Sequence, residues 1–124
     1  MSHSARGGWL GWLLAVPLLC LGVPGHAMVD CTGKVTNLSL QLGDTGTITL
    51  SISGGPTYTY LCDIAGGGRN GVAPEVCKAM YATLLAAKSM NRQVLIRFND
   101  YSSCAAAPSW DAAGSVGWTQ LMLD

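Results

Sequence analysis

The positions of four cysteines constrain this chain more than any other feature. Cys31, Cys62, Cys77 and Cys104 all follow an apolar N-terminal segment, which itself contains the fifth cysteine, Cys20. Disulfides persist in oxidising compartments and stabilise domains whose hydrophobic core is small. We therefore expect a small domain that folds outside the cytoplasm and is held by two disulfides. Four cysteines allow three pairings.

Residues 1–27 have the pattern of a secretory signal peptide. Arg6 supplies a positive start, residues 9–23 are apolar, and Gly25-His26-Ala27 provides the small residues of a cleavage site before Met28. The alternative is an uncleaved membrane anchor, but the core of the apolar stretch is shorter than the roughly 20 residues that a spanning helix needs. We expect cleavage, export to the periplasm or the medium, and one domain over residues 28–124.

The charge and histidine content of residues 28–124 exclude several classes of function. Lys and Arg number seven in the whole chain, as do Asp and Glu, and only Arg6 lies in the expected leader, so the domain has a net charge of −1. No basic surface is expected to bind nucleic acid. Both histidines, His3 and His26, also lie in the leader. Their loss removes histidine-based triads and most zinc sites, so we expect no metal and no cofactor.

Hydrophobic periodicity predicts five strands and one helix. Apolar and polar residues alternate in the first part of the chain, with a slip near Asn37, which predicts three strands joined by short turns. The pattern then changes to an apolar residue every third or fourth position, headed by a proline, which predicts a helix. The predicted strands span residues 34–42, 47–53, 57–62, 93–99 and 118–123, the helix spans residues 74–90, and a long loop spans residues 100–117.

The order strand, strand, strand, helix, strand, strand is the element order of the OB-fold, a five-stranded Greek-key barrel. In that barrel the first and fourth strands are antiparallel, which places Cys31 near Cys104. Cys62 ends the third strand and Cys77 lies in the first turn of the helix. The topology thus favours the pairs Cys31–Cys104 and Cys62–Cys77. A generic meander with a helix and other pairings remains the alternative.

Four stretches carry a resemblance to a known group of proteins: 58–62 (YTYLC), 71–78 (GVAPEVCK), 84–88 (LLAAK) and 94–98 (VLIRF). They resemble small exported bacterial proteins whose general form is similar to that of the receptor-binding B subunit of subtilase cytotoxin and related pertussis-like toxins. The resemblance implies an OB-fold-like barrel, and in those toxins the subunits are pentamers that bind sialylated glycans. No glycan-contacting residue of that family is matched here, so only the fold is carried over.

Candidate ligand-binding residues follow from where OB-folds bind, which is the face of the second and third strands and the adjoining loops. Tyr58, Tyr60, Tyr101 and Trp110 offer aromatic faces there that suit sugar rings or peptides. Arg97 alternates with apolar residues and is a candidate for recognising a carboxylate such as that of a sialic acid. The simpler interpretation is that the tyrosines pack on the barrel, Trp110 plugs its end and Arg97 is a solvated strand charge.

An enzyme is difficult to build from these residues. Ser102 and Ser103 have no histidine partner, and the carboxylates show no spacing that brings two together. We therefore expect a small exported non-enzymatic binding module that recognises a glycan or a protein and is a candidate homo-oligomer. The alternative is a structural or assembly protein of the cell envelope that acts through protein contacts. Neither hypothesis involves nucleic acid or stable membrane insertion after signal cleavage.

Overall fold

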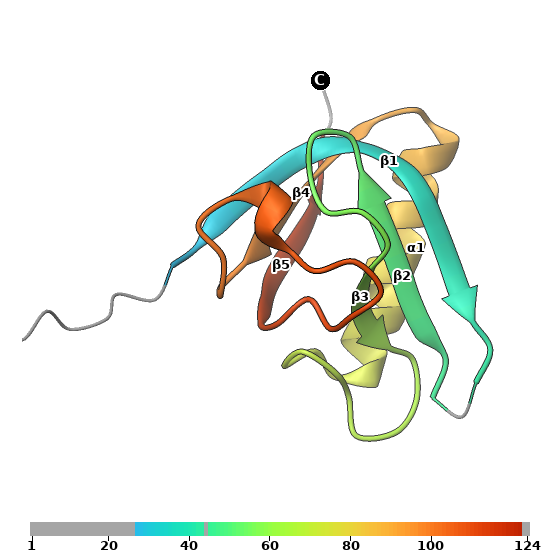
Figure 1. Cartoon of the computed structure of the whole chain (residues 1–124). Coiled ribbons are helices and arrows are strands. Elements are labelled where there is room, and N and C mark those ends of the chain that lie inside the picture. Colours follow the sequence, from blue (N-terminus) through green and yellow to red (C-terminus); the bar gives the residue numbers. More distant parts are fainter. Residues whose placement is uncertain (1–26, 44, 123–124) are drawn as a thin grey trace, which may run out of the picture.

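The computed structural model describes residues 27–43 and 45–122 as a mainly β structure with one α-helix (Figure 1). Apart from Ala27, the expected signal peptide lies outside the described residues. The elements are β1 (Val29–Gln41), β2 (Thr47–Ile52), β3 (Thr59–Asp63), α1 (Pro74–Ser89), β4 (Gln93–Phe98), a short 3-10 helix η1 (Cys104–Ala106) and β5 (Val116–Leu121). The predicted order of strands and helix is confirmed.

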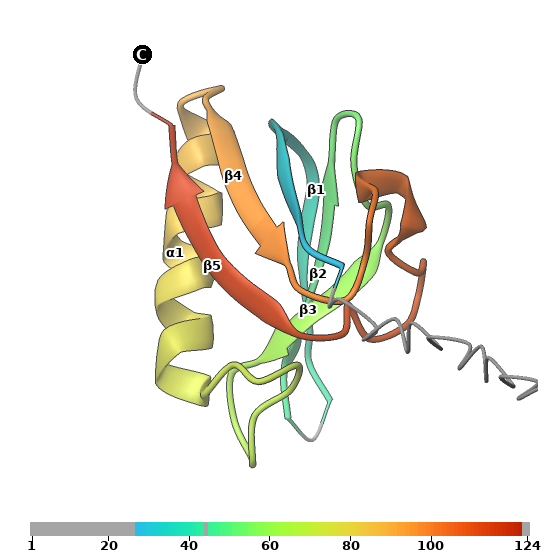
Figure 2. The same cartoon turned by 90° about the vertical axis from the view of Figure 1, so that its left-hand side faces the viewer.

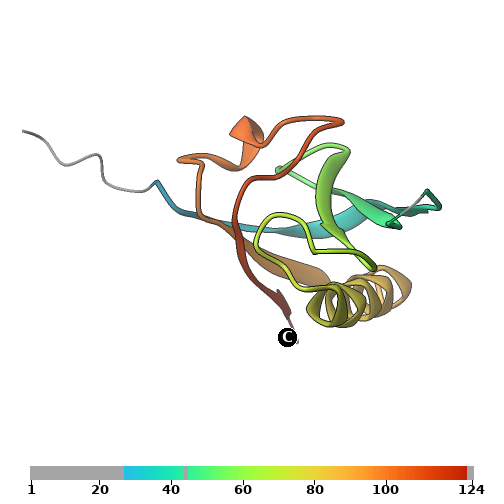
Figure 3. The same cartoon turned by 90° about the horizontal axis from the view of Figure 1, so that it is seen from below.

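The five strands form one antiparallel sheet in the order β3-β2-β1-β4-β5. The expectation of a closed barrel is wrong, because β3 and β5 remain the two edges of this sheet. A single parallel bridge between Tyr60 and Ala112 joins β3 to the segment that precedes β5. This segment runs beside β3 over only a few residues, which is too short a contact to continue the ladder. Helix α1 packs along the sheet and contacts β1, β3, β4 and β5 (Figures 2 and 3).

Strand β1 is shared by two ladders. Its first part, residues 29–34, pairs with β4, and its second part, residues 35–41, pairs with β2. The register shifts between Val35 and Asn37, which confirms the slip predicted from the sequence. The strand begins five residues earlier than predicted, because Cys31 and Gly33 fill its inward positions and neither gives a clear hydrophobic alternation.

Gly33 allows β1 to pass close to the end of β2. A Cβ atom at this position would lie 2.3 Å from the carbonyl oxygen of Ser53. The two segments are joined there by hydrogen bonds: the Ser53 N–H donates to the Lys34 carbonyl at 2.9 Å, and the Lys34 N–H donates to Ser53 Oγ at 2.9 Å. Only a residue without a side chain fits such a crossing.

Helix α1 confirms the prediction to within one residue. Pro74 lies at its start, where a missing N–H has no consequence, and Lys88 lies in its last turn, where a cation favours the helix dipole. Asn91 adopts a left-handed φ of 53° just after the helix, a conformation that asparagine tolerates better than most residues. The predicted apolar face is buried, and its residues are Cys77, Met80, Leu84 and Ala87.

Both predicted disulfides are present. Cys31 and Cys104 join the start of β1 to η1, and Cys62 and Cys77 join the end of β3 to the first turn of α1. By loop entropy the longer bridge is worth about 4 kcal/mol and the shorter about 3 kcal/mol as upper estimates. No helix within residues 27–43 and 45–122 is long and apolar enough to cross a membrane.

Candidate functional site

A backbone contact between two loops builds the candidate site. Residues 109–113 lie alongside the start of β3 and bond to it: the Trp110 N–H donates to the Tyr58 carbonyl at 2.8 Å, the Tyr60 N–H to the Asp111 carbonyl at 2.8 Å and the Ala113 N–H to the Tyr60 carbonyl at 2.9 Å. The hydroxyl of Ser109 also donates to the Thr57 carbonyl at 2.7 Å. The long loop before β5 is therefore attached to the turn before β3.

Tyr58 and Trp110 form an exposed aromatic pair at this contact. Their ring centroids are 4.8 Å apart and their planes differ by 8°, which is a stacked arrangement. Tyr58 is 37% exposed and Trp110 is 58% exposed, so each ring keeps a face or an edge in solvent. The two residues thus present a flat apolar surface that a ligand can reach.

Both residues of the pair have a backbone conformation that L-residues avoid. The φ angles are 50° for Tyr58 and 56° for Trp110, and among the described residues only Asn70 and Asn91 are other non-glycine cases. Asparagine tolerates this region, whereas tyrosine and tryptophan pay roughly 1–2 kcal/mol each. Such strain gathers at functional sites. It also explains why Tyr58 lies before β3, although the sequence predicted it inside the third strand: the strand begins only at Thr59.

Tyr60 lies in β3 and does not stack with Tyr58. Its ring lies under the guanidinium of Arg69, 5.7 Å from the ring centroid. Arg69 Nε also donates to Asp63 Oδ1 at 3.0 Å, and the Thr47 hydroxyl donates to the same oxygen at 2.7 Å. The side chain of Asp63 is only 8% exposed. This cluster ties the glycine-rich loop before α1 to the sheet, so Tyr60 borders the aromatic pair as a packing residue.

The Tyr101 side chain packs against the core and does not form part of the exposed aromatic pair. Its ring meets that of Phe98 edge to face, with centroids 6.4 Å apart, and is half-buried against the core. Burial raises the pKa of Tyr101 above its ordinary value of 10.0, and the nearby carboxylates of Asp100 and Asp111 raise it further. Of these two carboxylates, Asp111 directly follows Trp110 in the chain, so one acidic side chain adjoins the aromatic pair.

Arg97 is engaged by a carboxylate on the neighbouring strand. Its Nε and Nη2 atoms donate to Asp30 Oδ1 and Oδ2 at 2.7 and 2.8 Å, and the two residues lie opposite each other across the β1–β4 ladder. This hydrogen bonding lowers the pKa of Asp30 below its ordinary value of 3.8 and raises the pKa of Arg97. A guanidinium already paired in this way is poorly placed to recognise the carboxylate of a ligand.

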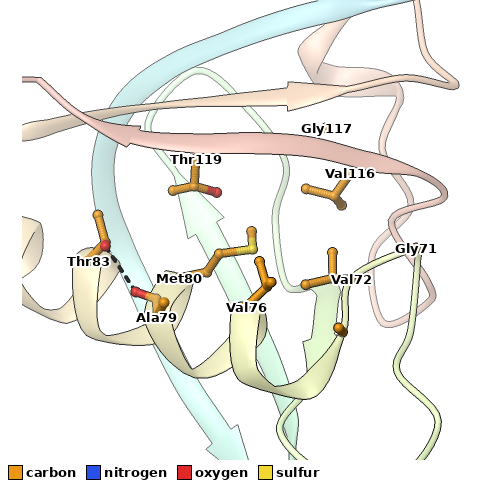
Figure 4. Close-up of a pocket in the computed structure, with 10 residues that line it drawn as sticks. Gly71, Val72, Val76, Ala79, Met80, Thr83, Val116, Gly117 and Thr119 are labelled. Atoms are coloured by element: carbon orange, nitrogen blue, oxygen red, sulfur yellow. Dashed lines mark hydrogen bonds between the residues drawn. The ribbon is translucent and has the colours of Figure 1, made fainter.

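The sequence did not predict a groove between α1 and β5. It has a volume of about 420 Å³, and Figure 4 shows side chains from the helix and the strand turned toward each other across it. The lining residues are uncharged: Gly71, Val72, Ala73, Val76, Ala79, Met80, Thr83, Val116, Gly117 and Thr119. A signal was present in the helix, since Val76 and Thr83 lie at helical spacing from Met80 and border the buried face that includes it.

The described residues contain no group of three or more His, Cys, Asp or Glu side chains that could hold a metal ion. Comparison of the chain with models of protein families, with curated proteins and with solved structures gave no match.

Proposed function

We propose that this protein is a small exported, non-enzymatic binding module that holds a sugar ring against Tyr58 and Trp110. The observation that carries the proposal is that two strained residues place two stacked, solvent-exposed rings at one point of the surface. Flat apolar rings suit the C–H face of a sugar, and the backbone strain makes little sense for a pair that only fills space.

A neutral sugar fits this site better than a sialylated one. Asp111 directly follows Trp110 and is exposed, and Asp100 lies in the same loop region. One oxygen of each carboxylate accepts a backbone N–H, from Ala112 and Ser115 respectively, and the second oxygen of each can accept a hydrogen bond from a sugar hydroxyl. The same carboxylates repel an anionic sugar, and Arg97 is paired with Asp30. We therefore do not carry the sialic acid preference of the resembling toxin subunits into the proposal.

The finer architecture is also a proposal: an OB-fold-like topology whose barrel is left open. The order of elements, the sheet order β3-β2-β1-β4-β5 and the parallel bridge between Tyr60 and Ala112 support it. In an OB-fold the ligand face adjoins the loop between the last two strands. Trp110 belongs to that loop, so the proposed fold and the proposed site agree.

A glycan array with the oxidised protein tests the function, and isothermal titration with the best sugar quantifies it. Trp110→Ala and Tyr58→Ala should each weaken binding about tenfold or more, because each removes an aromatic face worth more than about 1.4 kcal/mol. Leu85→Ala is the matched control, since Leu85 is 47% exposed on α1 and does not belong to the pair. Binding that survives both ring removals would place the site elsewhere, and an array without any signal would contradict glycan recognition.

A further inference from the structure

The two edge strands of the sheet, β3 and β5, differ in how many of their outward backbone groups are hydrogen-bonded. The edge at β3 is partly covered, because Tyr60 bonds to Asp111 and Ala113 through its backbone, and the Asn70 side-chain amide donates to the carbonyls of Tyr60 and Leu61. The edge at β5 has no such cover along most of its length. Within residues 45–122, β5 makes one backbone hydrogen bond outside its ladder with β4. In that bond the Val116 N–H donates to the Asn70 carbonyl at 3.1 Å.

The ladder between β4 and β5 determines which groups of β5 face outward. The Met122 N–H donates to the Gln93 carbonyl at 2.9 Å, so Met122 is directed toward β4. Pairs that exchange backbone hydrogen bonds alternate along an antiparallel ladder with pairs that do not. Thr119 lies opposite Ile96 and Leu121 lies opposite Val94, and both are pairs without hydrogen bonds. The N–H and C=O groups of Thr119 and Leu121 therefore point away from the sheet, where a further strand would lie.

The groove adjoins this edge and contains an unsatisfied polar atom. Thr119 Oγ1 is buried and has no hydrogen-bond partner among the described residues. Val76 reaches the groove from the helix and is 53% exposed, although it is apolar (Figure 4). Asn37 Oδ1 and Thr59 Oγ1 are unpaired in the same way, so this hydroxyl does not by itself indicate a partner. The exposed apolar Val76 and the outward backbone groups of β5 together have the properties of a surface that is covered in the functional protein.

Charge indicates what covers it. The β4–β5 ladder shifts register between the pairs Phe98–Val116 and Ile96–Thr119, so an irregularity lies in the first half of β5, while Thr119 to Leu121 pair regularly. Exposed edge strands are also protected by lysine or proline, and no charged residue and no proline occurs between Asp111 and Asp124. A strand of this kind can pair with its own copy without placing like charges opposite one another. Residues 28–124 have a net charge of only −1, so long-range repulsion between two copies is weak.

We propose that β5 pairs antiparallel with β5 of a second copy of this chain about a two-fold axis at residue 120. In this register Thr119 faces Leu121 of the second copy, and the outward groups of both residues exchange hydrogen bonds. The two sheets become one ten-stranded sheet, and the grooves of both copies close around the joint. The two-fold joint uses the β5 edge of both copies, so the assembly stops at a dimer.

Light scattering on the oxidised mature protein at about 100 μM tests this assembly, and the expected mass is that of a dimer. Val76→Lys places a charge at the groove and should yield a monomer. Thr119→Pro removes an outward N–H that the β4–β5 ladder does not use, and should do the same. Leu85→Lys is the matched control, because it adds the same charge to an exposed position of α1 outside the groove and should remain dimeric.

The register has its own test. Residue 120 would face its own copy across the axis in a pair without hydrogen bonds, where Cα atoms lie about 4.5 Å apart. Gln120→Cys should therefore form an intermolecular disulfide that a non-reducing gel detects, whereas Ala82→Cys should not. A monomeric or pentameric wild-type protein overturns the proposal. The proposal is also overturned if the Val76→Lys and Thr119→Pro variants both remain as dimeric as the wild type and circular dichroism shows that they are folded.

Discussion

The rings of Tyr58 and Trp110 are stacked 4.8 Å apart, and the N–H of Trp110 donates to the carbonyl of Tyr58 at 2.8 Å. The same two residues thus meet through both backbone and side chain, and both have left-handed φ angles. The backbone bond fixes where the rings lie, and the stack partly offsets the strain, since such a pair is worth about 0.5–1.5 kcal/mol beyond its buried area. The strain at these positions can be measured directly.

At position 110, glycine should give a more stable protein than alanine, which is the reverse of their usual order of stability. Glycine adopts a φ of 56° without cost, whereas alanine retains a penalty of about 1 kcal/mol. We expect Trp110→Gly to be more stable than Trp110→Ala by about 1 kcal/mol in urea unfolding. At Ala82, an exposed helical position, change to glycine should instead destabilise by about 1 kcal/mol. Equal stability of the two Trp110 variants would mean that the loop relaxes out of the strained conformation.

Addition of one methyl group at Gly33 should be costly. The new Cβ would meet the backbone carbonyl of Ser53 at 2.3 Å, so β1 or β2 must move and the two hydrogen bonds between Lys34 and Ser53 must lengthen. Gly33→Ala should destabilise by about 1–3 kcal/mol. Gly67→Ala is the matched control, because a Cβ there has no neighbour within 4 Å, and its effect should stay within about 0.5 kcal/mol. A tolerated Gly33→Ala would show that the crossing is looser than described.

The two disulfides should differ in how readily they are reduced. Cys62 and Cys77 are fully buried, whereas Cys104 in η1 is only partly buried. A thiolate must reach a sulfur atom before it can exchange. Limited dithiothreitol treatment of the native protein, followed by alkylation and peptide mapping, should label Cys31 and Cys104 first. Labelling of Cys62 and Cys77 at the same rate would indicate that reduction proceeds through global unfolding.

The pair of Asp30 and Arg97 should contribute to acid sensitivity. The pKa of Asp30 is lowered in the folded state, so its contribution is present above its unfolded pKa of 3.8 and is lost as the pH falls through the lower folded value. Asp30→Asn should therefore lower stability slightly at neutral pH and flatten its decline below about pH 4. Urea midpoints measured across this range provide the test. Arg97→Met should flatten the decline as well, and an unchanged acid profile in both variants would contradict the role of the pair.

Much of the fold could be predicted from local patterns. Strand β2, strand β4 and helix α1 have clear periodicity, and their bounds agree with the prediction to within a residue or so. The disulfide pairing followed from topology, because the antiparallel β1–β4 ladder brings Cys31 close to Cys104. The prediction of a closed barrel failed, since closure depends on whether β3 and β5 meet, and no local pattern in either strand encodes that meeting.

The sequence could predict which residue types contribute to the candidate site, but not their arrangement. The sequence identified Tyr58 and Trp110 as aromatic residues near one region, but it could not indicate that their rings stack or that their backbones are strained. It placed Tyr58 on a strand face because alternation with Tyr60 looked regular, whereas the left-handed φ of Tyr58 breaks that alternation. The pairing of Arg97 with Asp30 joins residues 67 positions apart and depends on strand register.

The division of β1 between two ladders has a consequence for maturation. Its second part pairs with β2, which follows it immediately in the chain, but its first part pairs with β4, some sixty residues later. The first part therefore stays unpaired until β4 is available. The 15-residue separation of Cys62 and Cys77 closes easily, whereas the 73-residue separation of Cys31 and Cys104 requires the finished sheet. The Cys31–Cys104 bond therefore marks completed folding, and when the reduced protein is refolded with a disulfide oxidant, the form with the Cys62–Cys77 bond alone should accumulate first.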